Sequence, residues 1–340
     1  MKTLRDMTAG ETTRPGIEPE TRELLARSLR ELFAAHSDSA AVTAALAELG
    51  WDEVREAAPE DATTLLFTEQ GRALATSRAL DEILLGELAA VLPTISGSRA
   101  VLYPHPDEDG PVPGLSGVLL GPLDGVDEVV APVTAADGGA EVLIIPAGRI
   151  AEAAVPVTGF DPRSGWLTLT GFTPGDVLPV RAGDAWRRGQ AAAHRALATE
   201  ITGVCEQALA MATAHTSARQ QYGRLIGSFQ AVRHRLAEAH VALAAARTAV
   251  EAAWTAAGDS HGGAWAARVA KLRAGRAQVE VFRHSLQVFG AMGLTRESDL
   301  HRYATRAAAL DALLGDHASL AEATGNELLA GAVPQRVVEI

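Results

Sequence analysis

Residues 229–250 read FQAVRHRLAEAHVALAAARTAV, and this stretch decides the fold of the C-terminal part of the chain. Its apolar residues recur at alternating steps of three and four, which is the spacing of one face of an α-helix. Three more stripes with similar spacing cover residues 201–212, 269–289 and 300–313. Four such stripes with short connections predict an antiparallel four-helix bundle over residues 190–330. By periodicity alone, such a bundle is more typical of a structural or interaction protein than of an enzyme.

The composition changes between residues 93 and 183, where glycine and proline become frequent. Short β-branched runs appear there, among them Val142-Leu143-Ile144-Ile145 and Trp166-Leu167-Thr168-Leu169-Thr170. Turn residues separate the runs, which predicts a small antiparallel β domain. The strand–helix alternation of a nucleotide-binding α/β fold is missing.

Residues 21–92 have helical periodicity, and Gly50 is placed to end one of the helices. Residues 1–20 are polar and contain no apolar segment of the kind found in secretory signals, so we expect a disordered leader there. The predicted fold class is therefore α+β, with an N-terminal helical domain, a small central β domain and a C-terminal helical bundle.

Composition excludes several classes of function. The net charge of −12 argues against a nucleic-acid partner, because binding phosphates requires a basic surface. The single cysteine, Cys205, excludes a disulfide framework, and the scattered histidines give no reason to expect a metal. No apolar run is long enough to cross a bilayer, so we expect no membrane contact and a cytoplasmic location.

One candidate binding segment is Arg219-Gln220-Gln221-Tyr222-Gly223, which follows the first bundle helix. The Arg219 guanidinium could hold a phosphate or pyrophosphate through two parallel hydrogen bonds, and Tyr222 offers an aromatic face for a ring. The alternative interpretation is a solvated arginine at a helix end, where its charge favours the last carbonyls.

A second candidate segment runs from Gln287 to Glu297 and contains Gly290 and Gly293. Glycines allow a ligand to approach the backbone closely, and the Gln287 amide can hydrogen-bond to a phosphate or a ribose. The alternative is an ordinary corner between helices, with one of the glycines capping the first helix.

Together, in order and spacing, these two segments resemble the acyl-CoA dehydrogenase family. Its members carry an Arg-x-x-aromatic-Gly sequence, then Phe-Gln, here Phe229-Gln230, and later a Gln-x-x-Gly-Gly-x-Gly motif, here with Ala291 at the second glycine. The resemblance is good from about residue 190 to residue 315 and loose before that. It implies a helical–β–helical fold, an FAD cofactor, and α,β-desaturation of an acyl thioester carried on CoA or on an acyl-carrier protein.

The sequence departs from the family where the catalytic base belongs. The two family positions for this carboxylate correspond to Leu314 and Ala193, whose side chains cannot accept a proton. Asp316, Glu297 and His194 are the remaining candidates for a displaced base. The β domain also matches the family's flavin-binding sequences poorly: Ile95–Ser98 is a weak match, and Trp166-x-Thr168 lies near the end of the domain.

In the family, the arginine and the Gln-Gly segment reach across a subunit interface to a neighbour's FAD. The resemblance therefore implies that this chain shares FAD with a longer acyl-CoA dehydrogenase homologue, as the short subunit of an α2β2 assembly. The residues it implies for FAD binding are Arg219, Tyr222, Gln287, Gly290 and Gly293. Two alternatives remain open: a self-sufficient homo-oligomeric flavoenzyme with a displaced base, and a non-redox scaffold that keeps the fold.

Overall fold

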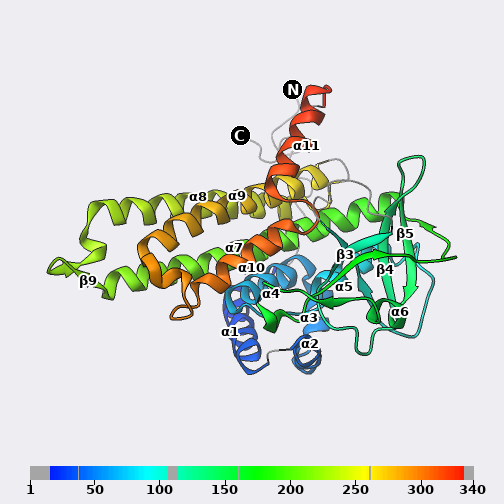
Figure 1. Cartoon of the computed structure of the whole chain (residues 1–340), viewed down its shortest axis with the longest axis horizontal. Helices are drawn as coiled ribbons and strands as arrows, with labels where there is room; N and C mark the ends of the chain where they lie inside the picture. Colours follow the sequence, from blue (N-terminus) through cyan, green and yellow to red (C-terminus); the bar gives the residue numbers. More distant parts are fainter. Residues whose placement is uncertain (1–15, 37, 106–113, 160, 260–261, 333–340) are drawn as a thin grey trace, which may run out of the picture.

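The computed structural model describes residues 16–36, 38–105, 114–159, 161–259 and 262–332, and it is mostly helical with two small β-sheets (Figure 1). Helices at the start of the chain, the sheets and a long helical bundle follow one another in sequence. The predicted α+β fold class is therefore confirmed. Most of the leader expected at residues 1–20 lies outside the described residues.

Five helices form the N-terminal region. A proline occupies the first turn of the first and the fourth of them, where its missing N–H costs no hydrogen bond. Asp38 caps the second helix by accepting a hydrogen bond from the Ala41 N–H, and Gly50 adopts a left-handed φ of 73° after that helix ends. The helices are α1 (Pro19–Ala35), α2 (Ser39–Glu48), α3 (Trp51–Ala57), α4 (Pro59–Ala73) and α5 (Ala79–Leu88).

Two four-stranded sheets form the β region, in the strand orders β1-β4-β5-β8 and β2-β3-β7-β6. Apolar residues of both sheets, such as Val129 and Leu169, share one core, whereas others, such as Val130 and Val142, belong to the core shared with the helices. The strand pairs in these sheets are antiparallel except β1 with β4, which is parallel because the chain passes through the second sheet before it returns to the first. The prediction of a purely antiparallel domain is wrong for that pair. The strands are β1 (Arg99–Val101), β2 (Tyr103–Pro104), β3 (Leu115–Leu119), β4 (Glu128–Thr134), β5 (Ala140–Pro146), β6 (Val155–Pro156), β7 (Leu167–Phe172) and β8 (Val180–Arg181), with the short helix α6 (Ala147–Ala151) after β5.

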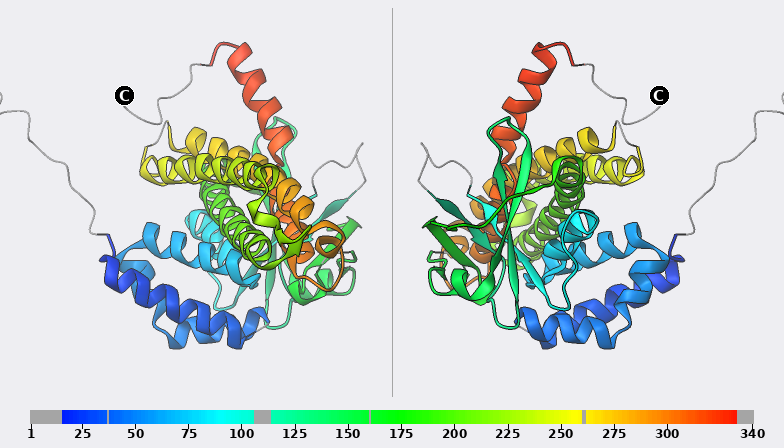
Figure 2. Two further views of the ribbon diagram at one scale, coloured as in Figure 1. Left: turned by 90° about the vertical axis from the view of Figure 1, so that its left-hand side faces the viewer. Right: turned by 90° about the vertical axis from the view of Figure 1, so that its right-hand side faces the viewer.

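The C-terminal bundle confirms the four predicted helical stripes. Figure 1 shows α7, α8 and α9 lying lengthwise beside one another, with a small hairpin of β9 (Gln220–Gln221) and β10 (Arg224–Leu225) at the end away from the sheets. Figure 2 shows the N-terminal helices and the sheets on opposite sides of α7. The helices are α7 (Gly183–Ala218), α8 (Gln230–Thr255), α9 (Gly263–Phe289), α10 (Leu300–Ala312) and α11 (His317–Leu329).

The buried face of α9 differs from the predicted apolar stripe. Val279, which lies in the apolar stripe predicted over residues 269–289, is 43% exposed, whereas Ala270, Ala274 and the charged Lys271 are buried. The reason is that α9 packs along both α7 and α8 and also contacts α10, so small side chains are needed on its inner face. The larger Val279 therefore points outward.

Glycines allow α4 and α7 to cross in close contact. A methyl group on Gly203 of α7 would lie 2.5 Å from the carbonyl oxygen of Thr68 in α4, and one on Gly71 would overlap the Glu200 carbonyl. Since the obstacle in both cases is backbone, no side chain can move aside to make room. The contact between the N-terminal region and the bundle thus depends on the absence of two side chains.

We expect Gly203→Ala to lower the free energy of unfolding by about 1–3 kcal/mol, because the two helices would have to separate. Gly86→Ala is the matched control, since Gly86 lies in α5 and a methyl group there meets nothing within 4 Å. This control should gain up to ~1 kcal/mol from helix propensity. Urea unfolding of both variants measures the difference, and equal stabilities would contradict the close crossing.

Candidate functional site

The hairpin at the far end of the bundle carries Arg219 and Tyr222. Arg219 ends α7, and its N–H donates to the His215 carbonyl at 2.9 Å. Tyr222 and Gly223 both have positive φ values, 53° and 75°, as a two-residue hairpin turn requires. This turn leaves the Tyr222 side chain 92% exposed, with its ring edge-on to Phe229.

The Gln287 segment lies at the same end of the bundle. The Phe289 ring at the end of α9 stacks on the His215 ring near the end of α7, with ring centres 4.3 Å apart. Burial and the nearby Arg219 charge lower the pKa of His215, which favours the neutral imidazole in this stack. The structure therefore brings together the two segments that the sequence singled out.

The polar groups at this end, which we call the bundle tip (Arg219, Tyr222, Gln287 and Gly290), are available to a ligand. Within the described parts of the chain, the side chains of Arg219 and Gln287 have no hydrogen-bond or ion-pair partner. A methyl group on Gly290 would meet nothing within 4 Å, so the backbone there is open. A free guanidinium, an amide, an aromatic ring and an open backbone fit a pyrophosphate attached to a ring system.

Gly293, which the resemblance also implies for FAD binding, differs from the tip residues because it is buried. A methyl group there would lie 3.0 Å from Phe289 Cβ and 3.2 Å from Leu286 Cδ2. The glycine therefore makes room for the turn after α9 to fold back on the helix. Its geometry fits a packing role for this position better than direct contact with a ligand.

The two family positions for the catalytic base lie close together. Leu314 follows α10 with a left-handed φ of 57°, and Ala193 is fully buried in α7. His194, the residue after Ala193, donates from Nε2 to the Leu314 carbonyl at 2.9 Å. The structure thus links both positions in one corner, which contains aliphatic side chains where a carboxylate would be needed.

Two of the three displaced-base candidates, His194 and Asp316, have environments that lower their pKa and so weaken them as bases. Burial lowers the pKa of His194 to about 4. Asp316 caps α11 by accepting hydrogen bonds from the N–H groups of Ala318 and Ser319, which hold its pKa below the usual range. Glu297 is exposed near the start of α10, at the opposite end of that helix from Leu314.

Lys271 is a buried charged residue that sequence reasoning missed. Its ammonium group is fully buried beneath the α10–α11 turn and donates to the carbonyls of Asp311, at 2.7 Å, and Gly315, at 3.2 Å. Burial lowers its pKa to about 8, although the Asp311 carboxylate lies 3.5 Å away. The signal was present in the sequence, because Lys271 is three and four residues from Ala274 and Ala267 on the inner face of α9.

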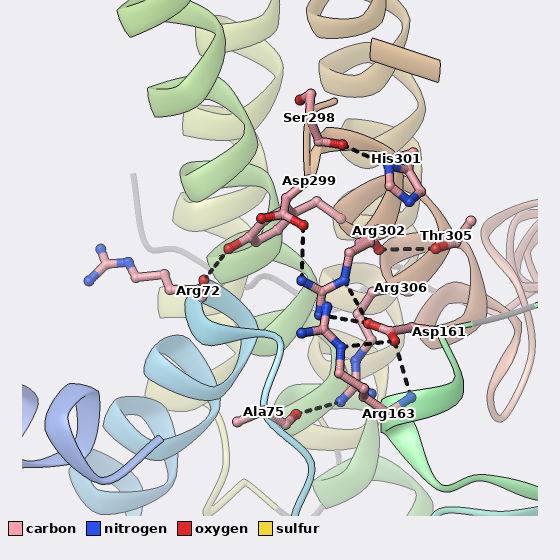
Figure 3. Close-up of polar contacts among 11 residues, drawn as sticks. Arg72, Ala75, Asp161, Arg163, Ser298, Asp299, His301, Arg302, Thr305 and Arg306 are labelled. Atoms are coloured by element: carbon pink, nitrogen blue, oxygen red, sulfur yellow. Dashed lines mark hydrogen bonds and ion pairs between the residues drawn. The ribbon is translucent and has the colours of Figure 1, made fainter. Parts of the chain in front are cut away.

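A buried ion pair joins the bundle to the rest of the chain. Arg306 of α10 donates from Nη2 to Glu200 of α7 at 2.6 Å, and Gln70 of α4 donates to the other Glu200 oxygen at 2.9 Å. Arg306 also donates to the Ala75 carbonyl, as Figure 3 shows. Its guanidinium lies 5.1 Å from the centre of the Trp166 ring, so Trp166 packs in the core.

Other β-region residues that could have faced a flavin also have partners within the chain. Thr168 shares a hydrogen bond of 2.9 Å with His105, and the Ser98 N–H donates to Asp127 at 2.8 Å. The loop after β6 contacts the bundle through Asp161, which pairs with Arg302 at 2.7 Å (Figure 3). The Asp161–Arg302 ion pair thus holds the β region against α10.

Two classes of site find no support in the structure. None of the helices in the described ranges is both long and apolar enough to span a membrane. Among the same residues, no group of three or more histidine, cysteine, aspartate or glutamate side chains is arranged to hold a metal ion. The bundle tip and the Leu314 corner therefore remain the two places of interest.

Comparisons with known proteins agree with this geometry. Residues 190–329 match the family described as acyl-CoA dehydrogenase, C-terminal domain. Acyl-CoA dehydrogenase IpdE2 of Mycobacterium tuberculosis is 29% identical over 317 residues, which are 85% of this chain and 91% of that protein. Two solved structures share the fold with a TM-score of 0.70. One is the ChsE4-ChsE5 complex from Mycobacterium tuberculosis, which is 20% identical and covers 93% of this chain and 99% of its own. The other is a Tcur3481-Tcur3483 steroid ACAD variant, which is 23% identical and covers 92% of this chain and 98% of its own.

The helical bundle therefore matches the C-terminal domain of the acyl-CoA dehydrogenase family, and the chain as a whole shares its fold with the two solved structures. The resemblance predicted from Arg219–Gly223 and Gln287–Gly293 is confirmed at the level of the family. The matching region covers both segments of the bundle tip and both positions of the Leu314 corner.

We expect acidification to destabilise the protein through His194. Its pKa is about 4 in the folded chain, against 6.5 for a histidine free in solution. The unfolded chain therefore binds more protons in this window, and stability present above pH 6.5 is lost as the pH falls towards 4. The loss should be roughly 1–3 kcal/mol.

The His194→Gln variant tests this effect, because glutamine can keep the donor to Leu314 and does not titrate. Urea unfolding at about pH 7.5 and about pH 4.5 should show a smaller loss for the variant than for the natural chain. Parallel losses in the two proteins would show that His194 does not contribute.

Proposed function

We propose that this chain is one subunit of an FAD-dependent acyl-CoA dehydrogenase and that a partner subunit supplies the catalytic base. The observation that carries the proposal is the contrast between two parts of the chain. The bundle tip presents unpaired groups to solvent, whereas Leu314 and Ala193 place aliphatic side chains at the base positions. Such a chain can complete a cofactor site without performing the proton transfer itself.

The tip residues have distinct roles in this proposal. The Arg219 guanidinium binds the pyrophosphate of FAD with two parallel hydrogen bonds, and the Gln287 amide orients a phosphate or ribose hydroxyl. The Tyr222 ring covers a flat part of the cofactor, and Gly290 allows close approach to the backbone. When bound, FAD would supply the hydride acceptor for the α,β-desaturation of an acyl thioester.

The partner in this proposal is a longer acyl-CoA dehydrogenase homologue. The tip is exposed and convex, so its groups can contact a cofactor only if another chain encloses that cofactor. Two of the fold neighbours are described as complexes or pairs of named proteins, ChsE4-ChsE5 and Tcur3481-Tcur3483. The acyl group is carried on CoA or on an acyl-carrier protein, and the assembly is cytoplasmic.

A visible absorbance spectrum of the purified chain, with and without the co-expressed homologue, tests the proposal. Flavin bands that appear only in the co-purified complex are the expected result. Flavin retained by the chain alone, together with turnover of an acyl-CoA, would replace the proposal with a self-sufficient homo-oligomeric enzyme. Absence of flavin from every assembly would leave a non-redox scaffold.

We expect Arg219→Ala to weaken flavin retention in the complex by about 1–3 kcal/mol, the usual cost of losing a charged hydrogen bond. Arg181→Ala is the control, because Arg181 is an exposed arginine of the β region that pairs with Asp137 and Glu141. The flavin-to-protein ratio after gel filtration measures both. A ratio that stays the same in the Arg219 variant would count against the role of the tip.

A further inference from the structure

Arg195 is a buried arginine without a hydrogen-bond or ion-pair partner for its guanidinium among the described residues. It lies in α7 and is only 9% exposed. Its Nε atom is fully buried and has no hydrogen-bond acceptor among those residues. The guanidinium does face the Trp254 ring, whose centre is 5.3 Å away.

An unpaired charge in this position is costly. Moving an arginine out of water without a counter-charge or acceptors costs several kcal/mol, so buried guanidinium groups in proteins are normally paired. Burial lowers the pKa of Arg195, and the charges of Glu87 and Glu60 offset only part of that effect. Among the described residues, the group therefore lacks a negatively charged partner.

Two adjoining cavities meet at Arg195. One has an empty volume of about 660 Å³ and lies between α4, α5, α7 and the end of α8. The second opens on the other side of Arg195, towards the start of α7 and the start of α9. Ala257 and Gly258 line both cavities as well, so the guanidinium stands where they join.

The other charged groups around the cavities are already engaged. Arg188 pairs with Glu87 at 3.0 Å, and Arg187 pairs with Asp184. Glu60 and Asp259 also have partners of their own. Of the charged side chains that line these cavities, Arg195 therefore lacks an ion-pair partner among the described residues, and a ligand could provide the opposite charge.

This charge balance favours a monoanion. A dianionic phosphate would place a second negative charge near Glu60 and Glu87, whereas a carboxylate matches one guanidinium through two parallel hydrogen bonds. The walls of this open cavity include the apolar side chains of Ile83 and Ala192 and the Trp254 ring, beside polar groups such as Thr63. They suit a ligand with an apolar or aromatic body behind its carboxylate.

We propose that Arg195 is the anchor of a binding site for a small monocarboxylate with an apolar body, located between the N-terminal helices and the bundle. The site lies near the start of α7, and the bundle tip that we propose for FAD lies at its other end. The two proposals are therefore independent. An occupant at Arg195 would contact α4, α5, α7 and α8 at once and would stabilise their arrangement.

Thermal unfolding of the full chain with sodium benzoate as the probe tests this site. Benzoate should raise the midpoint in a saturable manner, while benzamide and sodium chloride at equal ionic strength should not. Arg195→Met, which keeps the length of the side chain, should weaken the apparent affinity by at least about tenfold. Arg187→Gln is the matched control, because that arginine lines the same opening but is exposed and paired, and it should bind like the natural chain.

The outcomes separate the alternatives. No benzoate-dependent shift in the natural chain, or an equal shift in Arg195→Met, would overturn the proposal. A shift with inorganic phosphate but not with benzoate would show an anion site of another class and would also overturn it. If Arg195→Met fails to fold, Arg195→Lys keeps the charge without the two-pronged geometry, and its affinity should fall as well.

Discussion

The ion pair between Glu200 and Arg306 is the interaction on which the arrangement of the regions depends. Burying either charge alone would cost free energy, so each charge requires the other. Gln70 also donates a hydrogen bond to Glu200, and the Trp166 ring packs against Arg306. These residues come from α4, α7, α10 and the β region. A single desolvated network thus fixes how three parts of the chain meet.

Helix α7 connects this network to the bundle tip, because it contains Glu200 and ends next to Arg219. Its first half is enclosed by the N-terminal helices, the β region and the bundle, whereas its last turns extend beyond the body of the protein. Buried polar residues such as His194, Arg195 and Glu200 concentrate in the enclosed half, and Arg219 follows the free end. Burial therefore divides the helix into a part that sets internal geometry and a part that can meet another molecule.

Much of the fold was predictable, because long stripes such as that beginning at Phe229 determine helix position and length. The face of α9 was not, since alanines give little contrast in hydrophobicity and Val279 could be assigned to the wrong side. The family resemblance also implied that the segments of Arg219 and Gln287 act together, and the structure brings these segments to the same end of the bundle. The sequence could not reveal the partners of Lys271, or that Arg195 has no ion-pair partner among the described residues, because both depend on which distant atoms surround a charge.

The turn after α10 has a consequence for how the chain can change over evolutionary time. Lys271 holds this turn by main-chain carbonyl oxygens, and His194 does so through the carbonyl of Leu314. Every amino acid has that main-chain carbonyl, so these hydrogen bonds do not depend on which side chain occupies position 314. Residues that tolerate its left-handed φ could be exchanged there without dismantling the loop. The conformation of the turn therefore does not depend on the residue at position 314. A carboxylate at this position could be lost or regained during evolution while the fold stays the same.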